Sequence, residues 1–375
     1  MINLMGLEKI NQWNFFVRVR DWYGRFERPI SSLSLIGGFV FDAITLQRVD
    51  LFWDNLWVVA HLLIVGTCII LINRNERAAG DEKNPAKMHF WLVNVMQFFF
   101  GGILSTYLVF YFRSSDIFAE WPFILVLALA FWANESFKRA YVRLSFQIIL
   151  YYLSIFAFAI FLVPVVIHEM GPAIFIVSGI FSLVVIAIFL ILLSKLSKGK
   201  VGKNKEMVIA WVGFVFIVVN ILYFNNFIPP IPLSLKDSGV YHSIKKNSDG
   251  NYVITHEPTS WADYFTLYDD FHATSDTFVY VYTAVFSPPL LNVNIIHDWQ
   301  YLDPTTNKWT DEEKIALSVS GGRDGGFRTW SVKNDLGPGR WRVNVETENG
   351  QTIGTVRFTV IASSSPDNLI TDIKN

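Results

Sequence analysis

Residues 144–167 read LSFQIILYYLSIFAFAIFLVPVVI, a stretch of 24 residues without one charged side chain. An α-helix rises about 1.5 Å per residue, so about 20 apolar residues cross the roughly 30 Å hydrocarbon core of a bilayer. We therefore predict that this stretch is a membrane-spanning helix. In the whole chain, 52% of the 375 residues are hydrophobic and 17% are charged, whereas soluble proteins carry about 25% charged residues. These proportions exclude a cytosolic enzyme and a disordered scaffold.

Six further apolar blocks surround this one, all of them before Pro229. In chain order, the seven blocks are Ser31–Leu46, Leu51–Ile72, Phe90–Phe112, Ala119–Asn134, Leu144–Ile167, Pro172–Leu193 and Met207–Asn225. Five of them have the length that a crossing needs. The first and the fourth have only about 16 residues, a length that also fits a re-entrant or buried segment.

Basic residues are unevenly distributed between the loops that join these blocks. If all seven blocks cross, the N-terminal flank and alternate loops hold 17 Lys and Arg residues, and the other loops hold two. Lys and Arg accumulate in cytoplasmic loops, and leaving out either short block would put its basic flank on the charge-poor side. We therefore predict a seven-helix domain over residues 31–227 in the cytoplasmic (inner) membrane. Its N-terminus faces the cytoplasm, and the C-terminal part of the chain is periplasmic or extracellular.

The first 30 residues mix aromatic with basic side chains. Such a mixture is typical of an amphipathic helix that lies on the inner leaflet, and a partly ordered tail is the alternative. No cleavable signal peptide is expected, because the first apolar stretch begins only near residue 30, behind a charged segment.

The sequence pattern changes after residue 227. Residues 228–236 are rich in proline, which lacks an amide donor and favours extended backbone, so we expect a stiff stalk. Beyond the stalk, short alternating segments lie between Gly, Pro and Asn turns. Six segments are predicted strands: Thr277–Val285, Leu290–Tyr301, Lys314–Val319, Phe327–Lys333, Gly339–Thr347 and Thr352–Ile361. Seven to nine strands over residues 237–362 indicate an all-β, immunoglobulin-like antiparallel sandwich, and residues 363–375 are expected to be a flexible tail.

The clearest β signal is a hairpin around Asn349-Gly350. Apolar and polar residues alternate on both sides of this dipeptide, which favours a tight hairpin turn. The apolar positions, predicted to form one buried face, are Trp341, Val343, Val345, Val356, Phe358 and Val360.

These segments resemble a known bacterial family. The matching residues are His297-Asp298-Trp299, Arg328-Thr329-Trp330-Ser331-Val332-Lys333, Gly339-Arg340-Trp341-Arg342-Val343-Asn344-Val345, Gly350, Gly354 and Phe358-Thr359-Val360. Together they are similar to the family catalogued as domain of unknown function 2914, over about 70 residues. The resemblance implies a domain that follows several membrane spans. It implies no activity and no catalytic or binding residue.

Both faces of the segment 277–286 are apolar, although a half-exposed strand needs only one apolar face. Phe278, Tyr280 and Tyr282 lie on the second face. Either residues 261–271 or the stalk cover this face, or it is a tyrosine-centred surface that binds a partner. Arg328 lies on an apolar face too. It is expected to lie against a tryptophan or bond a turn carbonyl, with anion recognition as the alternative.

Several histidines and carboxylates are candidate metal ligands or catalytic groups. His297 shares a face with apolar residues and is expected to be a hydrogen-bonded core histidine. Asp269, Asp270 and His272, and the pair His256 and Glu257, are donor types that bind metals. Their spacing matches no metal motif, which favours solvated loops. Because Cys68 is the only cysteine, a cysteine-based metal cluster is excluded. No metal, cofactor or catalytic residue is predicted.

The candidate ionisable residues within or at the ends of the apolar blocks are Asp42, Asp54, His61 and Glu135. Charged groups are costly in a bilayer and often mark a transport or catalytic site. Hydrogen bonds between helices are the interpretation we favour.

The function expected from the sequence is binding without catalysis. The helices would anchor a β-domain that binds an envelope component, a glycan or another protein. The alternative is a membrane transporter or lipid-modifying enzyme with its site among the helices and the β-domain as an accessory lid. The lipid bilayer is an expected partner, and nucleic acid is not.

Overall fold

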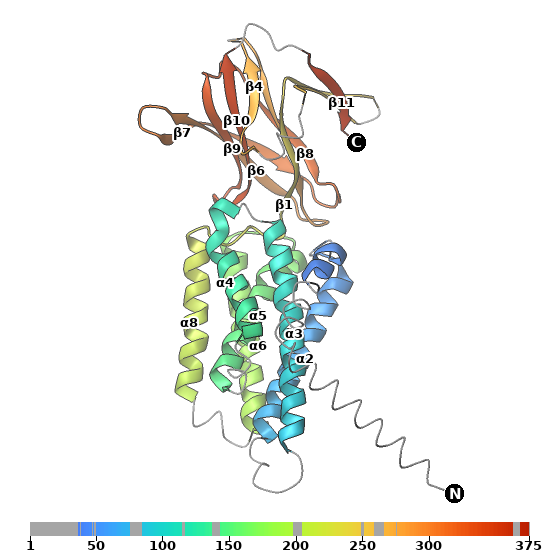
Figure 1. The fold of residues 1–375 in the computed structure, drawn as a ribbon, viewed down its shortest axis with the longest axis vertical. Coiled ribbons are helices and arrows are strands. Elements are labelled where there is room, and N and C mark those ends of the chain that lie inside the picture. Colours follow the sequence, from blue (N-terminus) through green and yellow to red (C-terminus); the bar gives the residue numbers. More distant parts are fainter. Residues whose placement is uncertain are drawn as a thin grey trace, which may run out of the picture.

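A helical N-terminal half is followed by an all-β C-terminal region, with the β-region at one end of the helices (Figure 1). The computed structural model describes residues 37, 39–46, 48, 50–75, 85–114, 117–136, 143–197, 205–248, 251–258, 266–274, 276–362 and 368–374, without the side chains of 75, 85–91, 117–120 and 135–136. The predicted segment 1–30 lies outside these residues.

The helices form a bundle around one central helix. Their bounds are α2 Phe52–Asn75, α3 Pro85–Arg113, α4 Ile117–Ser136, α5 Leu144–Ile167, α6 Pro172–Leu196 and α8 Lys205–Phe224. The central helix is α5, which packs against α2, α3, α6 and α8. It is apolar on every side, so it can be buried all round.

Five helices are long and apolar enough to cross a membrane: α2, α3, α5, α6 and α8. The apolar part of α4, Trp121–Asn134, is shorter. Residues 39–45 are also helical and belong to the predicted first block, whose beginning lies outside the described residues. Membrane insertion is thus indicated, and the number of seven crossings stays a prediction.

Three sheets make up the β-region. Its strands are β1 Ser234–Tyr241, β2 Ser243–Lys246, β3 Tyr252–His256, β4 Asp269–Ala273, β5 Val279–Phe286, β6 Val293–Asp303, β7 Lys308–Val319, β8 Phe327–Lys333, β9 Gly339–Thr347, β10 Thr352–Ala362 and β11 Ile370–Lys374. The sheet orders are β1-β5-β8, β4-β10-β9-β6-β7 and β11-β3-β2. The pairings are antiparallel except for the parallel pair β4–β10.

The predicted hairpin is confirmed. Strands β9 and β10 pair antiparallel, with Phe358 opposite Trp341 and Val356 opposite Val343. All six predicted apolar positions are buried. All six predicted strands are present as β5 to β10, with unchanged ends for β8 and β9 and shifted ends for the others. The described residues form eleven strands, ten of them before residue 363, where seven to nine were predicted over residues 237–362.

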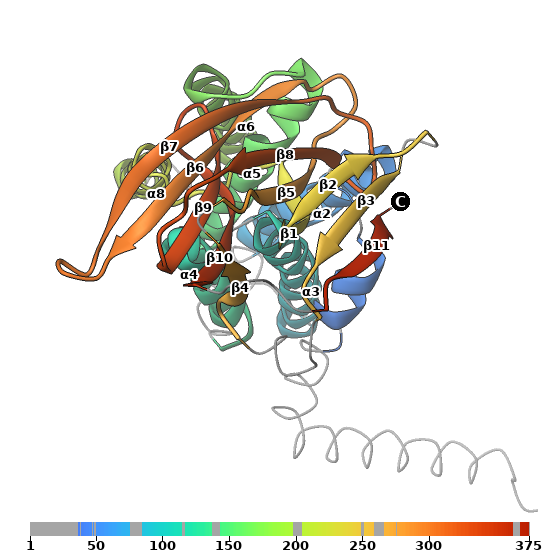
Figure 2. The same ribbon diagram turned by 90° about the horizontal axis from the view of Figure 1, so that it is seen from above.

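Strand β5 lies in a middle layer, which explains its two apolar faces. Val279 and Val281 pack in one core cluster with Trp299 and Phe358 of the five-stranded sheet. On the opposite face, Tyr282 packs in a cluster formed largely by β2 and β3, with members Tyr241, Ile244, Tyr252, Ile254 and Ala284. Figure 2 shows β2, β3 and β11 side by side on one flank of the β-region. The immunoglobulin-like topology stays a prediction.

The stalk prediction is wrong. Ile228 and Ile231 belong to the core cluster of the helices, and Leu233 belongs to a core cluster of the β-region. Strand β1 begins at Ser234, so no extended spacer separates the two parts. Prolines restrict the backbone but do not prevent burial, because Pro lacks the amide hydrogen that would need a partner.

The tail prediction is wrong for residues 370–374. Ile370–Lys374 form β11, which pairs antiparallel with β3. The backbone pairing with β3 holds β11 in place, because the side chains of Ile370 and Ile373 are exposed. The ammonium group of Lys374 adds an ion pair, 2.6 Å from Oδ2 of Asp237.

Candidate functional site

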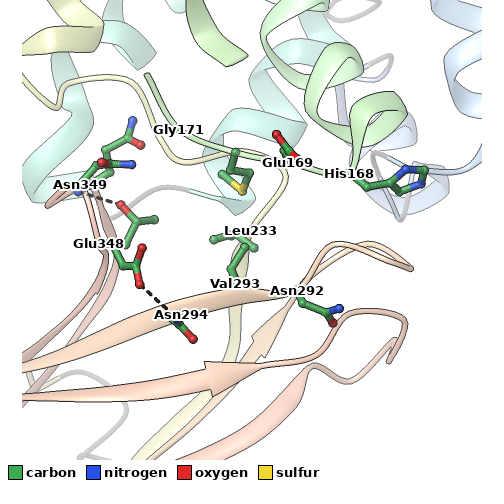
Figure 3. Close-up of a pocket in the computed structure, with 12 residues that line it drawn as sticks. His168, Glu169, Gly171, Leu233, Asn292, Val293, Asn294, Glu348 and Asn349 are labelled. Carbon is green, nitrogen blue, oxygen red and sulfur yellow. Dashed lines mark hydrogen bonds between the residues drawn. The ribbon is translucent and has the colours of Figure 1, made fainter. Parts of the chain in front are cut away.

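A polar cavity lies where the helices meet the β-region (Figure 3). Its volume is about 290 Å³. Three segments supply most of its lining: the α5–α6 connection, the start of β6 and the β9–β10 turn. The lining residues are His168, Glu169, Met170, Gly171, Leu233, Asn292, Val293, Asn294, Thr347, Glu348, Asn349 and Gln351.

The helix-side wall is a tight reversal between two long helices. His168 ends α5 in the left-handed region, with φ 61°, and its amide donates to Pro164 O at 2.8 Å. Gly171 precedes α6 with φ 122°, and Pro172 occupies the first turn of that helix. Glycine adopts this φ without the steric cost of a side chain. The reversal therefore turns polar backbone and side chains toward the β-region.

The opposite wall is held by side-chain hydrogen bonds. Asn294 Nδ2 donates to Glu348 Oε1 at 2.9 Å, and Ser318 Oγ donates to Asn294 Oδ1 at 3.0 Å. Gln351 Nε2 donates to the carbonyl oxygen of Ile228 at 3.3 Å. These bonds fix Glu348 in place and tie the turn to the segment that follows α8.

The lining residues define what the cavity can bind. Two carboxylates, Glu169 and Glu348, accept hydrogen bonds, and the amides of Asn292, Asn349 and Gln351 donate and accept them. None of the twelve lining residues is Lys or Arg. The cavity therefore favours a ligand with hydroxyl or amine groups over an anion. Ligand sites commonly lie at domain junctions, and this volume is near their lower size limit of about 300 Å³.

One known family matches part of the β-region. Residues 292–360 match the family model described as "Protein of unknown function (DUF2914)". This DUF2914 region runs from the residue before β6 into β10 and supplies seven of the twelve lining residues of the cavity. The family prediction is thus confirmed for the C-terminal part of the chain.

Other comparisons add little. No curated protein matches the chain. Among solved structures, a β-glucosidase from Listeria innocua in complex with isofagomine has TM-score 0.18 and 10% identity, and the match covers 34% of this chain and 16% of that one. A Pseudomonas fluorescens alkylpurine DNA glycosylase, AlkC, bound to DNA containing an abasic site analog, has TM-score 0.20 and 9% identity, with coverage of 82% and 98%. Both TM-scores are too low to indicate a shared fold.

The tyrosine-centred surface needs correction. Tyr282 is only 1% exposed, because β2 and β3 cover it, so its side chain cannot form an accessible surface. Of the predicted covers, residues 261–265 lie outside the described part of the chain, and the described core contacts of Tyr282 come from β1, β2 and β3. Phe278 is 52% exposed and Tyr280 is half-buried. Their role in binding stays a prediction.

Arg328, in the DUF2914 region, lies against an aromatic ring. Its guanidinium carbon is 5.8 Å from the centre of the Tyr252 ring. A guanidinium at this distance is attracted by the ring face. The geometry favours a structural role against an aromatic ring, but the ring is that of Tyr252 and not a tryptophan as predicted. Arg328 does not line the polar cavity.

His297 lies in a polar pocket of the DUF2914 core and is fully buried. Its Nδ1 is 2.8 Å from Ser331 Oγ and its Nε2 is 3.0 Å from Thr283 Oγ1. Trp299 Nε1 donates to Ser331 Oγ at 3.0 Å. Burial lowers the pKa of His297 to about 4, so this histidine is neutral and structural in role.

A second buried group of the DUF2914 region was not singled out from sequence. Asp298 is 1% exposed, and its Oδ2 accepts a 2.6 Å bond from Gln300 Nε2. Its Oδ1 has no hydrogen-bond partner among the described residues. Burial and the neighbouring carboxylate of Asp311 raise the pKa of Asp298. Asp298 lies on the face of β6 that the sequence pattern makes polar, so the pattern gave no sign of this burial.

Glu257 contacts two histidines, neither of which the sequence analysis paired with it. Its Oε2 is 2.7 Å from Nδ1 of His272, and its Oε1 is 3.1 Å from Nε2 of His242. Burial opposes ionisation, but hydrogen bonds from the backbone and ring of His272 and from His242 hold the pKa of Glu257 below its usual range. His242 was missed because it stands alone in the sequence.

The remaining residues considered as metal ligands do not lie in solvated loops. Asp269, Asp270 and His272 belong to β4 rather than to a loop, and His256 pairs with Asp372 at 2.9 Å. The described residues contain no group of three or more His, Cys, Asp or Glu side chains that could hold a metal ion.

Of the ionisable candidates in the helical part, His61 and Asp42 lie near each other. His61 Nδ1 is 2.8 Å from Trp57 O, and the His61 ring is near enough to Asp42 for electrostatic interaction. Asp54 lies near the start of α2, and the side chain of Glu135 is outside the described residues. Amides join neighbouring helices: Gln97 Nε2 donates to Asn134 O, and Asn73 Nδ2 donates to Gln147 Oε1, both at 2.8 Å.

Proposed function

We propose that this chain is a membrane-anchored binding protein whose β-region faces away from the cytoplasm and binds a glycan of the cell envelope. The observation that carries the proposal is the polar cavity at the junction. Its carboxylates and amides match the hydroxyl and amine groups of a sugar, and its volume fits a single ring. Binding needs no reacting group, which agrees with the non-catalytic expectation.

The location of the cavity supports the same proposal. One wall comes from the connection between α5 and α6, two candidate membrane spans, and the other comes from the DUF2914 region. A ligand in this cavity would lie close to the membrane surface. The helices then position the β-region at the height of glycans that are attached to, or pass along, the membrane.

Two variants and one control test the proposal. Glu348→Gln keeps the shape of the side chain and removes its charge, and Asn294→Ala removes the donor that fixes Glu348. We expect each to weaken binding of a sugar by about tenfold, since a hydrogen bond to a charged group contributes about 1.5–3 kcal/mol. Glu312→Gln, an exposed change farther along β7, should bind as the unchanged protein does.

The measurement is isothermal calorimetry on the full chain in nanodiscs, with a panel of neutral hexoses, amino sugars and N-acetylated disaccharides as probes. Saturable binding that Glu348→Gln weakens and Glu312→Gln does not supports the proposal. Absence of binding across the panel would refute it. Transport of a sugar or a lipid into sealed vesicles would favour the transporter alternative.

A further inference from the structure

A small basic notch lies on the molecule at the same end of the helices as the β-region. It is separate from the polar cavity and has a volume of about 20 Å³. Its lining comes from the segment before α2, the end of α3, the start of β1 and the end of β5. The lining residues are Arg48, Phe110, Arg113, Ser114, Pro232, Ser234, Lys236 and Phe286.

The notch lies where the apolar surface of the helices ends. Phe112, beside Arg113 in sequence, is 53% exposed, and Phe52 and Trp53 at the start of α2 are 70% and 74% exposed. Large apolar side chains exposed on candidate membrane spans face lipid, and aromatic residues gather at the interface with water. The basic groups therefore lie at the height of the lipid headgroups.

Three cations share this notch. Lys236 Nζ and Arg48 Cζ each lie 5.2 Å from the centre of the Phe286 ring. Arg113 donates to the carbonyl oxygens of Leu46 and Ala43. Burial, and then the positive charges of Arg113 and Arg48, hold the pKa of Lys236 below its usual range.

Two acidic groups among the described neighbours pair with Arg48. Its Nε donates to Asp50 Oδ1 at 2.9 Å, and its guanidinium also pairs with Asp324. Lys236 has no ion pair among the described residues. An ammonium group beside two other cations would gain most from an anion that enters the notch.

We propose that Lys236, together with Arg113 and Arg48, binds the phosphate of an anionic phospholipid in the leaflet that faces the β-region. The notch has room for one phosphate oxygen, and the other oxygens remain at its rim. The exposed apolar side chains of Phe112 and Phe52 lie beside it to contact the acyl chains. Basic pockets at the ends of membrane helices bind lipid headgroups by this chemistry.

Lipid retention by the full chain tests the proposal. The chain is purified in detergent, supplied with phosphatidylglycerol or phosphatidylcholine, and bound lipid is counted by native mass spectrometry. We expect preferential retention of phosphatidylglycerol. Lys236→Gln should weaken it about fivefold, which is the typical contribution of one basic residue near a membrane surface. Lys245→Gln, which removes an exposed charge on β2, should change nothing.

Arg113 also donates hydrogen bonds to backbone carbonyls, so truncating it would disturb the structure. The variant for this position is therefore Arg113→Lys, which keeps the charge. We expect it to retain the lipid. Equal retention by Lys236→Gln and Lys245→Gln would overturn the proposal. Displacement of the lipid by inorganic phosphate alone would show a free-phosphate site and would overturn the lipid assignment.

Discussion

Gly171 and Asn349 meet at the junction of the two parts: a Cβ on Gly171 would lie 3.4 Å from the side-chain nitrogen of Asn349. Gly171 lies in the reversal between α5 and α6, and Asn349 lies in the β9–β10 turn. Two residues that are 178 positions apart in the sequence therefore lie in close contact, and one of them is a glycine. The same contact borders the polar cavity, so the two halves of the chain build its walls jointly.

Replacing Gly171 by Ala should destabilise this junction. The φ of 122° is outside the region that L residues adopt readily, so the alanine costs about 1–3 kcal/mol. We expect a lower melting temperature of the full chain in detergent and weaker sugar binding. Gly213→Ala in α8 is the control, because a Cβ there meets nothing within 4 Å. Equal melting of both variants would show that the reversal tolerates a side chain.

The buried His297 predicts a pH dependence of stability. Its pKa is about 4 in the folded chain and about 6.5 when unfolded. The unfolded chain therefore binds more protons between these values, so stability is full above pH 6.5 and falls as the pH drops toward 4. The loss amounts to roughly 3 kcal/mol.

Two variants isolate this effect in melts followed by tryptophan fluorescence between pH 7 and 4. His297→Gln cannot titrate, so its stability should change less with pH than that of the unchanged chain. Thr283→Val removes the hydroxyl bonded to Nε2 and should lower stability while keeping the pH dependence. Parallel curves for the unchanged chain and His297→Gln would contradict the assignment.

Truncation of Tyr282 should destabilise the protein far more than truncation of Phe278. Tyr282→Ala opens a cavity between β5 and the β2–β3 cover, and such large-to-small changes cost about 3–5 kcal/mol. Phe278→Ala removes a side chain that is half exposed, with an expected cost below about 1 kcal/mol. Melting temperatures of the two variants decide the point. Similar losses would mean that Phe278 also belongs to the core.

The alternation of apolar residues was sufficient to predict β9 and β10, in which buried residues recur at every second position. Strand β5 was predicted from a run that is apolar on both faces, and residues 308–313 of β7 were missed because they are largely exposed. Strand β1, SLKDSGVY, has no alternation, and β2 and β11 are short. Strand β1 pairs with β5, and β2 and β11 pair with β3, through backbone hydrogen bonds. Local sequence carries little information on such pairing.

The polar cavity could not be predicted from sequence. Its lining comes from three separate polar loops around residues 168–171, 292–294 and 347–351, and each looks like an ordinary connection. Their meeting depends on the buried segment 228–234, which was expected to be an extended stalk. Burial of that segment draws the β9–β10 turn against the helices.

The C-terminal strand should protect β3. Ending the chain after residue 367 removes β11 and leaves β3 as an open edge, which invites association between molecules. We expect the shortened protein to aggregate at lower temperature, as measured by light scattering. Lys374→Ala should cost only about 0.5–1 kcal/mol, because its ion pair with Asp237 is partly exposed. Unchanged scattering of the shortened chain would show that β11 does not guard this edge.

The orientation of the membrane part rests on charge alone and is directly testable. The predicted cytoplasmic loop between α6 and α8 includes Lys205, which is exposed, whereas Lys245 of the β-region is exposed on the predicted outer side. Cys68 is buried and is changed to Ser as background. In intact cells, a membrane-impermeant thiol reagent should label Lys245→Cys and not Lys205→Cys. After the cells are opened, both should label. Labelling of Lys205→Cys in intact cells would reverse the orientation, because basic loops would then lie outside, against the barrier that their charge presents to translocation.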